Sequence, residues 1–143
     1  ILDVFEKYET AAAKTKRQLT VRLPEQELPP CLCDPQRITQ VLSILIDNAL
    51  SYTPEDSRIT LSLSASEHRF LLKVSDNGPG IPDENKEKVF ERFYRAEDSR
   101  TGKEHFGLGL CIAREIVEAH GGRIQVTDNV PQGAVFSIML PDT

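Results

Sequence analysis

Residues 76–82, with the sequence DNGPGIP, restrict the possible folds more than any other part of the chain. They directly follow the apolar run of residues 70–74, which is typical of a buried strand. Gly78 and Gly80 lack a Cβ and accept positive φ angles, so the backbone can approach a ligand closely at these positions. We therefore predict that a strand ends here at a binding site, and that Pro82 opens a helix.

Asp76 is the residue of this stretch whose side chain could recognise a ligand. A carboxylate is only an acceptor, so at the floor of a pocket it selects a ligand edge that donates hydrogen bonds, such as the amino group of adenine. Guanine presents a carbonyl there and would be repelled. A strand-to-helix turn or a hairpin uses the same residue types, so the stretch alone leaves the binding and the turn interpretations open.

Length and composition predict one soluble globular domain. The chain has 143 residues, which suffice for one hydrophobic core and are too few for two. The formal net charge is -5 and no basic stripe is present, which disfavours nucleic-acid binding. The apolar runs are far shorter than the ~20 residues of a membrane-spanning helix, and no signal peptide leads the chain.

The three cysteines and three histidines do not form the patterns of a metal site or a disulfide framework. The cysteines are odd in number, so we interpret them as reduced core thiols, and the histidines as isolated surface or packing residues. These residues are Cys31, Cys33, Cys111, His68, His105 and His120.

Hydrophobic periodicity and turn residues predict alternating helices and strands. Helices are predicted over residues 1–16, 82–89 and 107–120, and in the segment that begins at the N-cap residue Asp34. Strands are predicted over residues 18–23, 58–66, 69–75, 123–128 and 134–140, with a very short one at 31–33. Residues 96–106 contain almost no apolar side chain and are interpreted as a mobile lid.

The helix that begins at Asp34 carries an amide at the edge of its apolar stripe. On a helical wheel Asn48 lies beside this stripe, with Ile44 and Ser51 on the same flank. The side chain of a lone helical Asn is usually hydrogen-bonded to nearby backbone, so Asn48 indicates a function only together with other motifs.

A second glycine-rich turn, Gly107-Leu108-Gly109-Leu110, stands where the last predicted helix begins. Such a turn presents unpaired backbone N–H groups and the positive end of the helix dipole, both of which suit phosphate. It is neither a Walker loop nor a dinucleotide fingerprint, and taken alone it would be a helix cap.

Four motifs in order carry a resemblance to a known family. They are Asn48-Ala49, the run from Asp76 through Gly78 to Gly80, the pair Phe90 and Phe93, and residues 107–110. This order resembles the N, G1, F and G2 boxes of the ATP-binding catalytic domain of sensor histidine kinases, over residues 34–140. Type II topoisomerases, heat-shock chaperones and mismatch-repair ATPases are the wider relatives of this GHKL, or Bergerat, fold.

The resemblance implies an α+β fold: a two-layer α/β sandwich in which a mixed, mostly antiparallel five-stranded sheet carries three helices on one face, with a mobile ATP lid. It also implies roles for individual residues. Asp76 would accept from the adenine amino group, Asn48 would bind Mg²⁺ and take part in catalysis, and Arg95 would reach the phosphates as the second catalytic residue. The remaining nucleotide-binding residues would be Tyr52, Gly78, Gly80, Ile81, Tyr94, Gly107, Leu108, Gly109 and Leu110.

The resemblance implies that the γ-phosphoryl group passes from ATP to a His on a separate dimerisation module and then to a response regulator. No histidine of this chain has the context of that acceptor, so residues 1–16 are interpreted as the end of the upstream module and 17–143 as the catalytic domain. The intact protein is expected to be a homodimer and a membrane-bound bacterial sensor with this domain in the cytoplasm.

Three departures from the family pattern leave alternatives open. Ile44 and Ser51 replace polar and basic residues common in relatives, and His105-Phe106 stands where the second glycine box usually begins. A nucleotide-binding regulatory or interaction module without phosphotransfer is one alternative. An anti-sigma-type serine kinase is the other.

Overall fold

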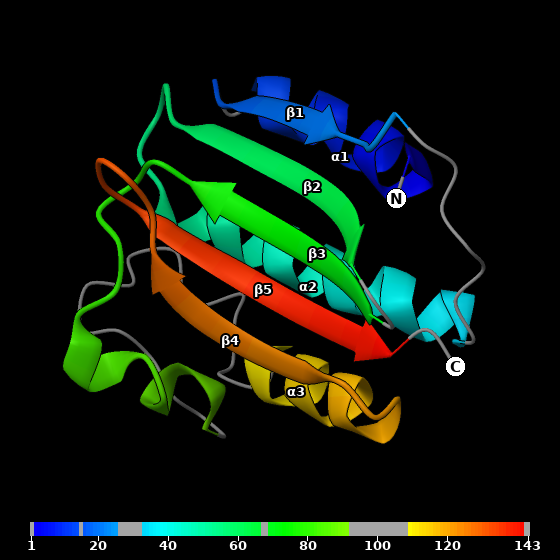
Figure 1. The fold of residues 1–143 in the computed structure, drawn as a ribbon. Helices are drawn as coiled ribbons and strands as arrows, with labels where there is room; N and C mark the ends of the chain where they lie inside the picture. The colour runs from blue at the N-terminus through cyan, green and yellow to red at the C-terminus, as the bar shows by residue number, and fades with distance from the viewer. Residues whose placement is uncertain (1, 15, 26–32, 67–68, 92–108, 142–143) are drawn as a thin grey trace.

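The computed structural model describes residues 2–14, 16–25, 33–66, 69–91 and 109–141. Within these residues, three α-helices lie on one face of a five-stranded sheet (Figure 1). The helices are α1 (Leu2–Lys14), α2 (Pro35–Tyr52) and α3 (Gly109–Ala119). The strands are β1 (Gln18–Arg22), β2 (Arg58–Ser66), β3 (Arg69–Asp76), β4 (Arg123–Asp128) and β5 (Ala134–Pro141).

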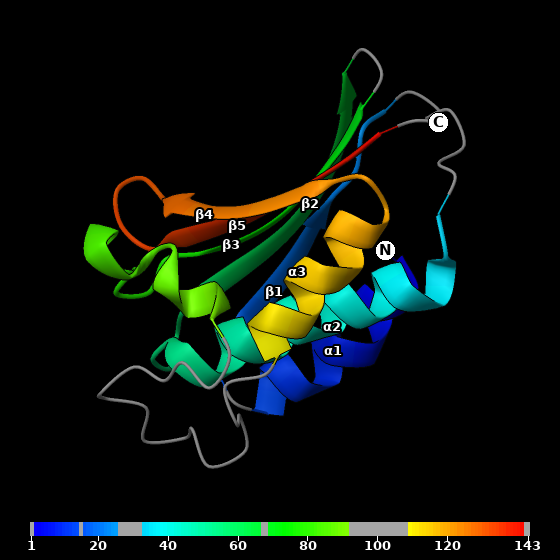
Figure 2. The same cartoon turned by 90° about the horizontal axis from the view of Figure 1, so that it is seen from below.

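The sheet has the strand order β1-β2-β3-β5-β4. β1 pairs with β2 in parallel, and the other neighbours are antiparallel. Figure 2 shows the helices together on one side of the sheet, as two layers. The predicted two-layer sandwich with a mixed, mostly antiparallel sheet is therefore confirmed. The order also places the β4–β5 hairpin directly beside β3, the strand that ends at Asp76.

The core lies between the sheet and α2. Inward-facing side chains alternate along the strands, and those of Ile59, Leu61 and Ile138 are fully buried. Val41, Leu45 and Ile46 of α2 are buried against them, as the predicted stripe requires.

The start of α2 has the predicted cap. Asp34 Oδ1 accepts hydrogen bonds from the backbone N–H groups of Gln36 at 3.0 Å and Arg37 at 3.4 Å, and Pro35 takes the first helical position. The backbone N–H of Asp34 donates to Nε2 of His120, 3.0 Å away, at the far end of α3. His120 therefore ties α2 to α3, in agreement with its interpretation as a packing histidine.

The predicted helix over residues 82–89 is wrong. The chain forms two short 3-10 turns instead, η1 (Asp83–Asn85) and η2 (Lys88–Phe90). This segment has only two buried side chains, Val89 and Phe90, so it has no apolar stripe to hold a longer helix against the core. The short strand predicted at 31–33 is not found at Cys33, and residues 31 and 32 lie outside the described ranges.

The described cysteines agree with the predicted reduced thiols. Cys111 is buried in α3 and Cys33 is half-buried, and neither is in a disulfide. Among the described residues, no group of His, Cys, Asp and Glu side chains is arranged to hold a metal ion. No helix in these ranges has the length and hydropathy that a bilayer span requires.

Candidate nucleotide site

Asp76 is the last residue of β3, and its side chain is 9% exposed. Its Oδ1 accepts hydrogen bonds from the backbone N–H groups of Gly78 at 2.9 Å and Ala134 at 3.3 Å. Burial raises the pKa of the Asp76 carboxyl above its ordinary value, and these two hydrogen bonds oppose the rise. No described residue donates to Oδ2, so one oxygen is held by backbone and the other remains available as an acceptor.

The turn after Asp76 is held in place by side-chain amides. Asn77 Oδ1 accepts from the backbone N–H of Arg58 at 2.7 Å, which ties the turn to the start of β2. From the β4–β5 hairpin, Asn129 Nδ2 donates to the carbonyl oxygen of Asp76 at 2.7 Å, and Gln132 Nε2 donates to that of Asn77 at 3.1 Å. The Asp76 carboxylate is thus fixed in position from both sides.

Gly133 allows the hairpin to approach Asp76 this closely. It has a φ of +114°, and a Cβ built on it would lie 2.0 Å from the carbonyl oxygen of Asp76. Gly80 has a φ of +80°, and its Cβ would lie 3.1 Å from the carbonyl oxygen of Gly133. A side chain at Gly133 would therefore push the hairpin away from the candidate site.

Gly78 packs against the end of α2. A Cβ at Gly78 would lie 2.8 Å from Cγ2 of Thr53, which is buried and follows α2 directly. The Thr53 hydroxyl donates to the carbonyl oxygen of Ala49 at 2.7 Å, and Arg17 Nε donates to the Thr53 carbonyl at 3.1 Å. Arg17 Nη2 also donates to that carbonyl. Thr53 therefore joins the glycine turn to the segment that follows α1.

The two glycine-rich motifs contact α2 at different points. A Cβ at Gly109, the first residue of α3, would lie 3.3 Å from Cγ2 of Ile44 on α2. Asn48 is half-buried one turn farther along the helix, towards Thr53. Ile44 and Thr53 are nine residues apart, which corresponds to about 14 Å along a helix. Asn48 therefore lies on α2 between the contact with Gly109 and the contact with Gly78.

Phe90 anchors the segment that leads away from the candidate site. Its ring meets that of Phe136 edge to face at 6.1 Å between centroids, and the Arg114 guanidinium lies 6.0 Å above it. Phe90 thus contacts both the sheet and α3. Its predicted partner in the same motif, Phe93, lies outside the described residues.

The remaining predicted site residues divide into two groups. Tyr52 is half-buried beside Thr53, and Ile81 and Leu110 are half-buried against the core. The others, with the proposed lid at 96–106, lie outside the described residues: Tyr94, Arg95, Gly107 and Leu108.

Sequence reasoning missed several residues that shape the candidate site. Thr53 precedes Pro54 at the end of a helix, a place where a polar side chain is a recognisable cap signal. Asn129, Gln132 and Gly133 lie between the predicted strands 123–128 and 134–140, but nothing in their spacing indicates that this turn packs against the end of β3.

Comparison with known families decides the membership of this chain. The model of the histidine kinase-, DNA gyrase B- and HSP90-like ATPases matches residues 33–143. The chain belongs to this ATPase family. The predicted resemblance is therefore confirmed.

Sensor kinases are among the most similar family members. The chain is 40% identical over 137 residues to the sensor protein CiaH of Streptococcus pneumoniae, covering 95% of this chain and 30% of CiaH. It is 46% identical over 111 residues to the sensor histidine kinase WalK of Bacillus subtilis, covering 76% of this chain and 18% of WalK. The chain thus spans less than a third of the length of either relative.

Solved structures of histidine kinases from this family have the same fold. The nucleotide-free catalytic domain of ThkA matches with a TM-score of 0.85 and 30% identity, over 99% of this chain and 90% of ThkA's. Full-length ShkA, solved in complex with AMPPNP, matches with a TM-score of 0.84 and 29% identity over 98% of this chain and 28% of its own. ThkA in complex with the response regulator TrrA matches with a TM-score of 0.82 and 30% identity, over 99% of this chain and 39% of that one.

Proposed function

We propose that this chain is the ATP-binding catalytic domain of a two-component sensor histidine kinase. The observation that carries the proposal is the Asp76 carboxylate, which is buried at a strand end with Oδ1 held by two backbone N–H groups and Oδ2 available. A fixed acceptor of this kind suits an amino group, as on adenine, and disfavours a carbonyl. Family membership and the AMPPNP complex of ShkA support ATP as the ligand.

The phosphates are proposed to lie beside α3. The first turn of this helix has N–H groups without helical partners and the positive end of the dipole, which suit phosphate oxygens. Gly109 packs on Ile44, so a nucleotide whose base meets Asp76 would extend along α2 past Asn48. The other residues proposed to bind ATP are Tyr52, Gly78, Gly80, Ile81, Tyr94, Arg95, Gly107, Leu108 and Leu110.

Mg²⁺ is proposed to be bound only together with the nucleotide. The described residues contain no cluster of acidic or histidine ligands, so these residues alone offer no complete coordination shell. The carbonyl oxygen of the half-buried Asn48 is a hard ligand of the type that Mg²⁺ accepts beside phosphate and water oxygens. The ion would offset charge on the phosphates, while Asn48 would orient them.

The proposed reaction transfers the γ-phosphoryl group to a His on a separate module. Residues 1–16 are proposed to end that module, and 17–143 to form the catalytic domain. His120 does not suit the acceptor role, because its Nε2 accepts from Asp34 while Nδ1 lies 2.8 Å from the carbonyl oxygen of Ile116. The domain would therefore act by positioning and charge stabilisation, with Arg95 proposed at the phosphates.

The next step is proposed to be transfer to a response regulator, since ThkA has been solved in complex with one. The intact protein is proposed to be a homodimer and a membrane-bound bacterial sensor. The dimer interface and the membrane anchor are proposed to lie outside this chain, which spans only 30% of a relative such as CiaH.

Calorimetry and then radiolabelled ATP test the proposal in two steps. This chain should bind ATP in calorimetry, more tightly with Mg²⁺ than with a chelator. The full-length protein should then form an acid-labile, alkali-stable phosphohistidine upstream of this domain. Binding without any labelled product would instead support a regulatory module, and an acid-stable label on an added protein would support a serine kinase.

A further inference from the structure

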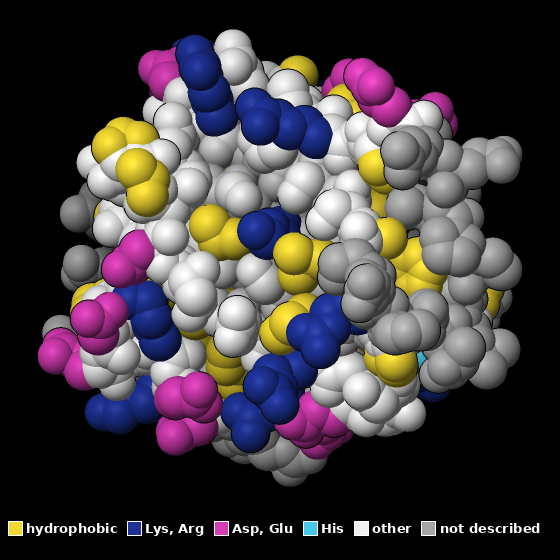
Figure 3. Space-filling view, viewed as in Figure 1, with side chains coloured by type: hydrophobic (Ala, Val, Ile, Leu, Met, Phe, Trp, Pro, Cys, Tyr) yellow, Lys and Arg dark blue, Asp and Glu magenta, His cyan; other side chains and the backbone are white. Residues whose placement is uncertain are grey.

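The face of the sheet that carries no helix has a distinctive charge distribution (Figure 3). The chain as a whole has more acidic than basic residues, 22 against 17. Side chains alternate between the two faces of the sheet along each strand. Every charged side chain at an outward position of β1 to β5 is nevertheless a cation. Acidic groups lie at the rim of this face in Figure 3. The outward cations are Arg22, Arg58, Arg69, Lys73 and Arg123.

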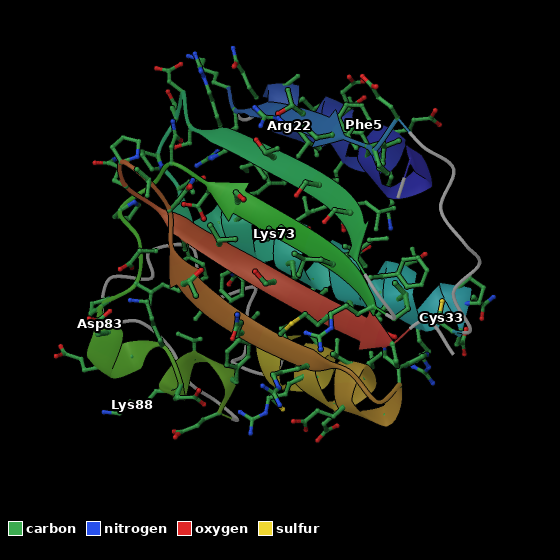
Figure 4. All side chains as sticks on the ribbon, in the orientation of Figure 1. Phe5, Arg22, Cys33, Lys73, Asp83 and Lys88 are labelled. Atoms are coloured by element: carbon green, nitrogen blue, oxygen red, sulfur yellow. The ribbon has the colours of Figure 1, made fainter. Side chains whose placement is uncertain are left out.

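The centre of this face combines these cations with an apolar pair. Leu71 of β3 lies opposite Met139 of β5, and Met139 lies opposite Arg123 of β4. Lys73 and Arg69 are the next outward residues on either side of Leu71, and Figure 4 shows Lys73 in the middle of the sheet. Neighbouring strands are about 4.8 Å apart, so the three cations surround the apolar pair closely. We call these residues the basic face: Arg69, Leu71, Lys73, Arg123 and Met139.

The three cations of the basic face have no partner among the described residues. The side chains of Arg69, Lys73 and Arg123 make no hydrogen bond or ion pair there. Other cations do: Lys86 Nζ lies 2.9 Å from a carboxylate oxygen of Asp128, and Arg114 makes an ion pair with the next turn of α3. The basic face is therefore a set of charges that nothing in the described part of the chain neutralises.

A hollow of about 290 Å³ opens at one end of the basic face. Arg69 and Arg123 line it together with Met139, Pro141 and the glycine pair Gly121 and Gly122 that follows α3. It lies at the start of β3, whereas Asp76 is at the end of that strand, a separation of about 23 Å for an eight-residue strand. The hollow is thus distinct from the candidate nucleotide site.

We propose that the basic face docks an acidic segment of a partner protein, with one carboxylate side chain bound in the hollow between Arg69 and Arg123. A guanidinium presents paired N–H donors that match the two oxygens of a carboxylate. The hollow therefore has the donors and the size for an Asp or Glu side chain. This interaction goes beyond the proposed ATP-dependent phosphotransfer.

Charge favours a compact acidic segment over other occupants. A second copy of this chain that docked through the same face would bring cations against cations. An anionic membrane or a nucleic acid is an extended polyanion, which would also meet the acidic rim and the net charge of -5. An acidic segment contacts the face alone, and half-buried Leu71 and Met139 offer apolar contacts between its charges.

An NMR titration of this chain tests the proposal. The probe is a synthetic decapeptide of alternating Glu and Ala, and the matched neutral peptide has Gln in place of Glu. The acidic peptide should shift backbone amides near Arg69, Lys73 and Arg123. Binding should weaken strongly between about 0.1 M and about 1 M salt, where the Debye length falls from about 10 Å to about 3 Å.

Charge-matched double variants provide the control. Arg69→Gln with Arg123→Gln should weaken binding of the acidic peptide about two- to thirty-fold, the range for losing two exposed charged contacts. Lys14→Gln with Arg37→Gln removes the same charge from exposed positions on α1 and α2 and should change binding less than twofold. Thermal unfolding should show that both variants are folded.

Several outcomes would overturn the proposal. They are equal binding of the neutral peptide, equal weakening in both double variants, shifts confined to other elements, and tighter binding to anionic lipid vesicles than to the peptide. None of these measurements uses ATP, so a failure here is distinguishable from a failure of the proposed kinase function.

Discussion

Replacing Asp76 by Asn separates its role in binding from its role in the fold. In the protein, Oδ1 accepts from the N–H groups of Gly78 and Ala134, and Oδ2 has no described partner. Asn keeps a carbonyl oxygen for the two N–H groups but turns an NH₂ group towards the proposed adenine. Two donors would then face each other, while the fold around residue 76 would be preserved.

The expected magnitude follows from these contacts. A hydrogen bond to a charged acceptor contributes about 1.5–3 kcal/mol, and a donor left unsatisfied costs about 1–3 kcal/mol. The sum, about 2.5–6 kcal/mol, corresponds to an ATP affinity lowered between about seventyfold and about 25,000-fold. Stability should be unchanged or slightly raised, because burial already disfavours the charged carboxylate. Asp76→Ala should instead destabilise the fold by about 2 kcal/mol or more, since it leaves two N–H groups without an acceptor.

Calorimetry with ATP and with inosine triphosphate checks this reasoning, together with thermal unfolding of each variant. The hypoxanthine base presents a carbonyl where adenine has its amino group, so Asp76→Asn should bind inosine triphosphate better than the unaltered protein does. An Asn variant that retains ATP affinity within about threefold and shows no gain for inosine triphosphate would refute the assignment of Asp76 to adenine.

Other predictions follow from the neighbours and the pKa of Asp76. Gly133→Ala should destabilise the fold by more than about 2 kcal/mol in denaturant unfolding and weaken ATP binding, because the new Cβ would lie 2.0 Å from a backbone oxygen. Gly121→Ala, at a φ of +76° but with its new Cβ in ordinary contact with Pro141 Cγ at 3.7 Å, should cost only about 1 kcal/mol, and a loss of stability as large as that of Gly133→Ala would contradict this. Arg17→Gln should lower ATP affinity by less than about tenfold through Thr53, and unchanged affinity and melting temperature would count against that link. Since the pKa of Asp76 is raised on folding, the folded state holds this proton more tightly. The stability of the protein relative to Asp76→Asn should therefore fall as pH rises from about 3.9 through the folded-state pKa, and a rise would contradict this.

Most of the fold could be predicted because its signals are local. Asp34 and Pro35 mark the start of α2, its apolar stripe fixes the buried face, and glycine ends α3. Strand alternation identified β2, β3, β4 and β5 within about a residue of their observed bounds. The helix prediction for residues 82–89 failed because a charged segment with two buried side chains carries no periodic signal that distinguishes a helix from 3-10 turns.

The candidate site was predictable only in part, for a different reason. Asp76, Gly78 and Gly109 stand in motifs whose spacing along the chain is informative, and the structure shows what each contacts. Thr53 and Gly133 act through contacts with residues 25 and 57 positions away, and no local pattern specifies such pairings. The sequence therefore indicates the candidate ligand-binding residues and does not reveal the residues that hold them in place.

The β4–β5 hairpin also bears on how this domain can be engineered. Its tip carries Val130, which is 88% exposed, and exposed loop tips are the usual choice for an inserted tag or fluorophore. Here Asn129, Gln132 and Gly133 beside that tip contact the backbone that carries Asp76, the carboxylate proposed to select adenine. A reporter inserted at this tip would therefore lower the nucleotide affinity that it was meant to measure.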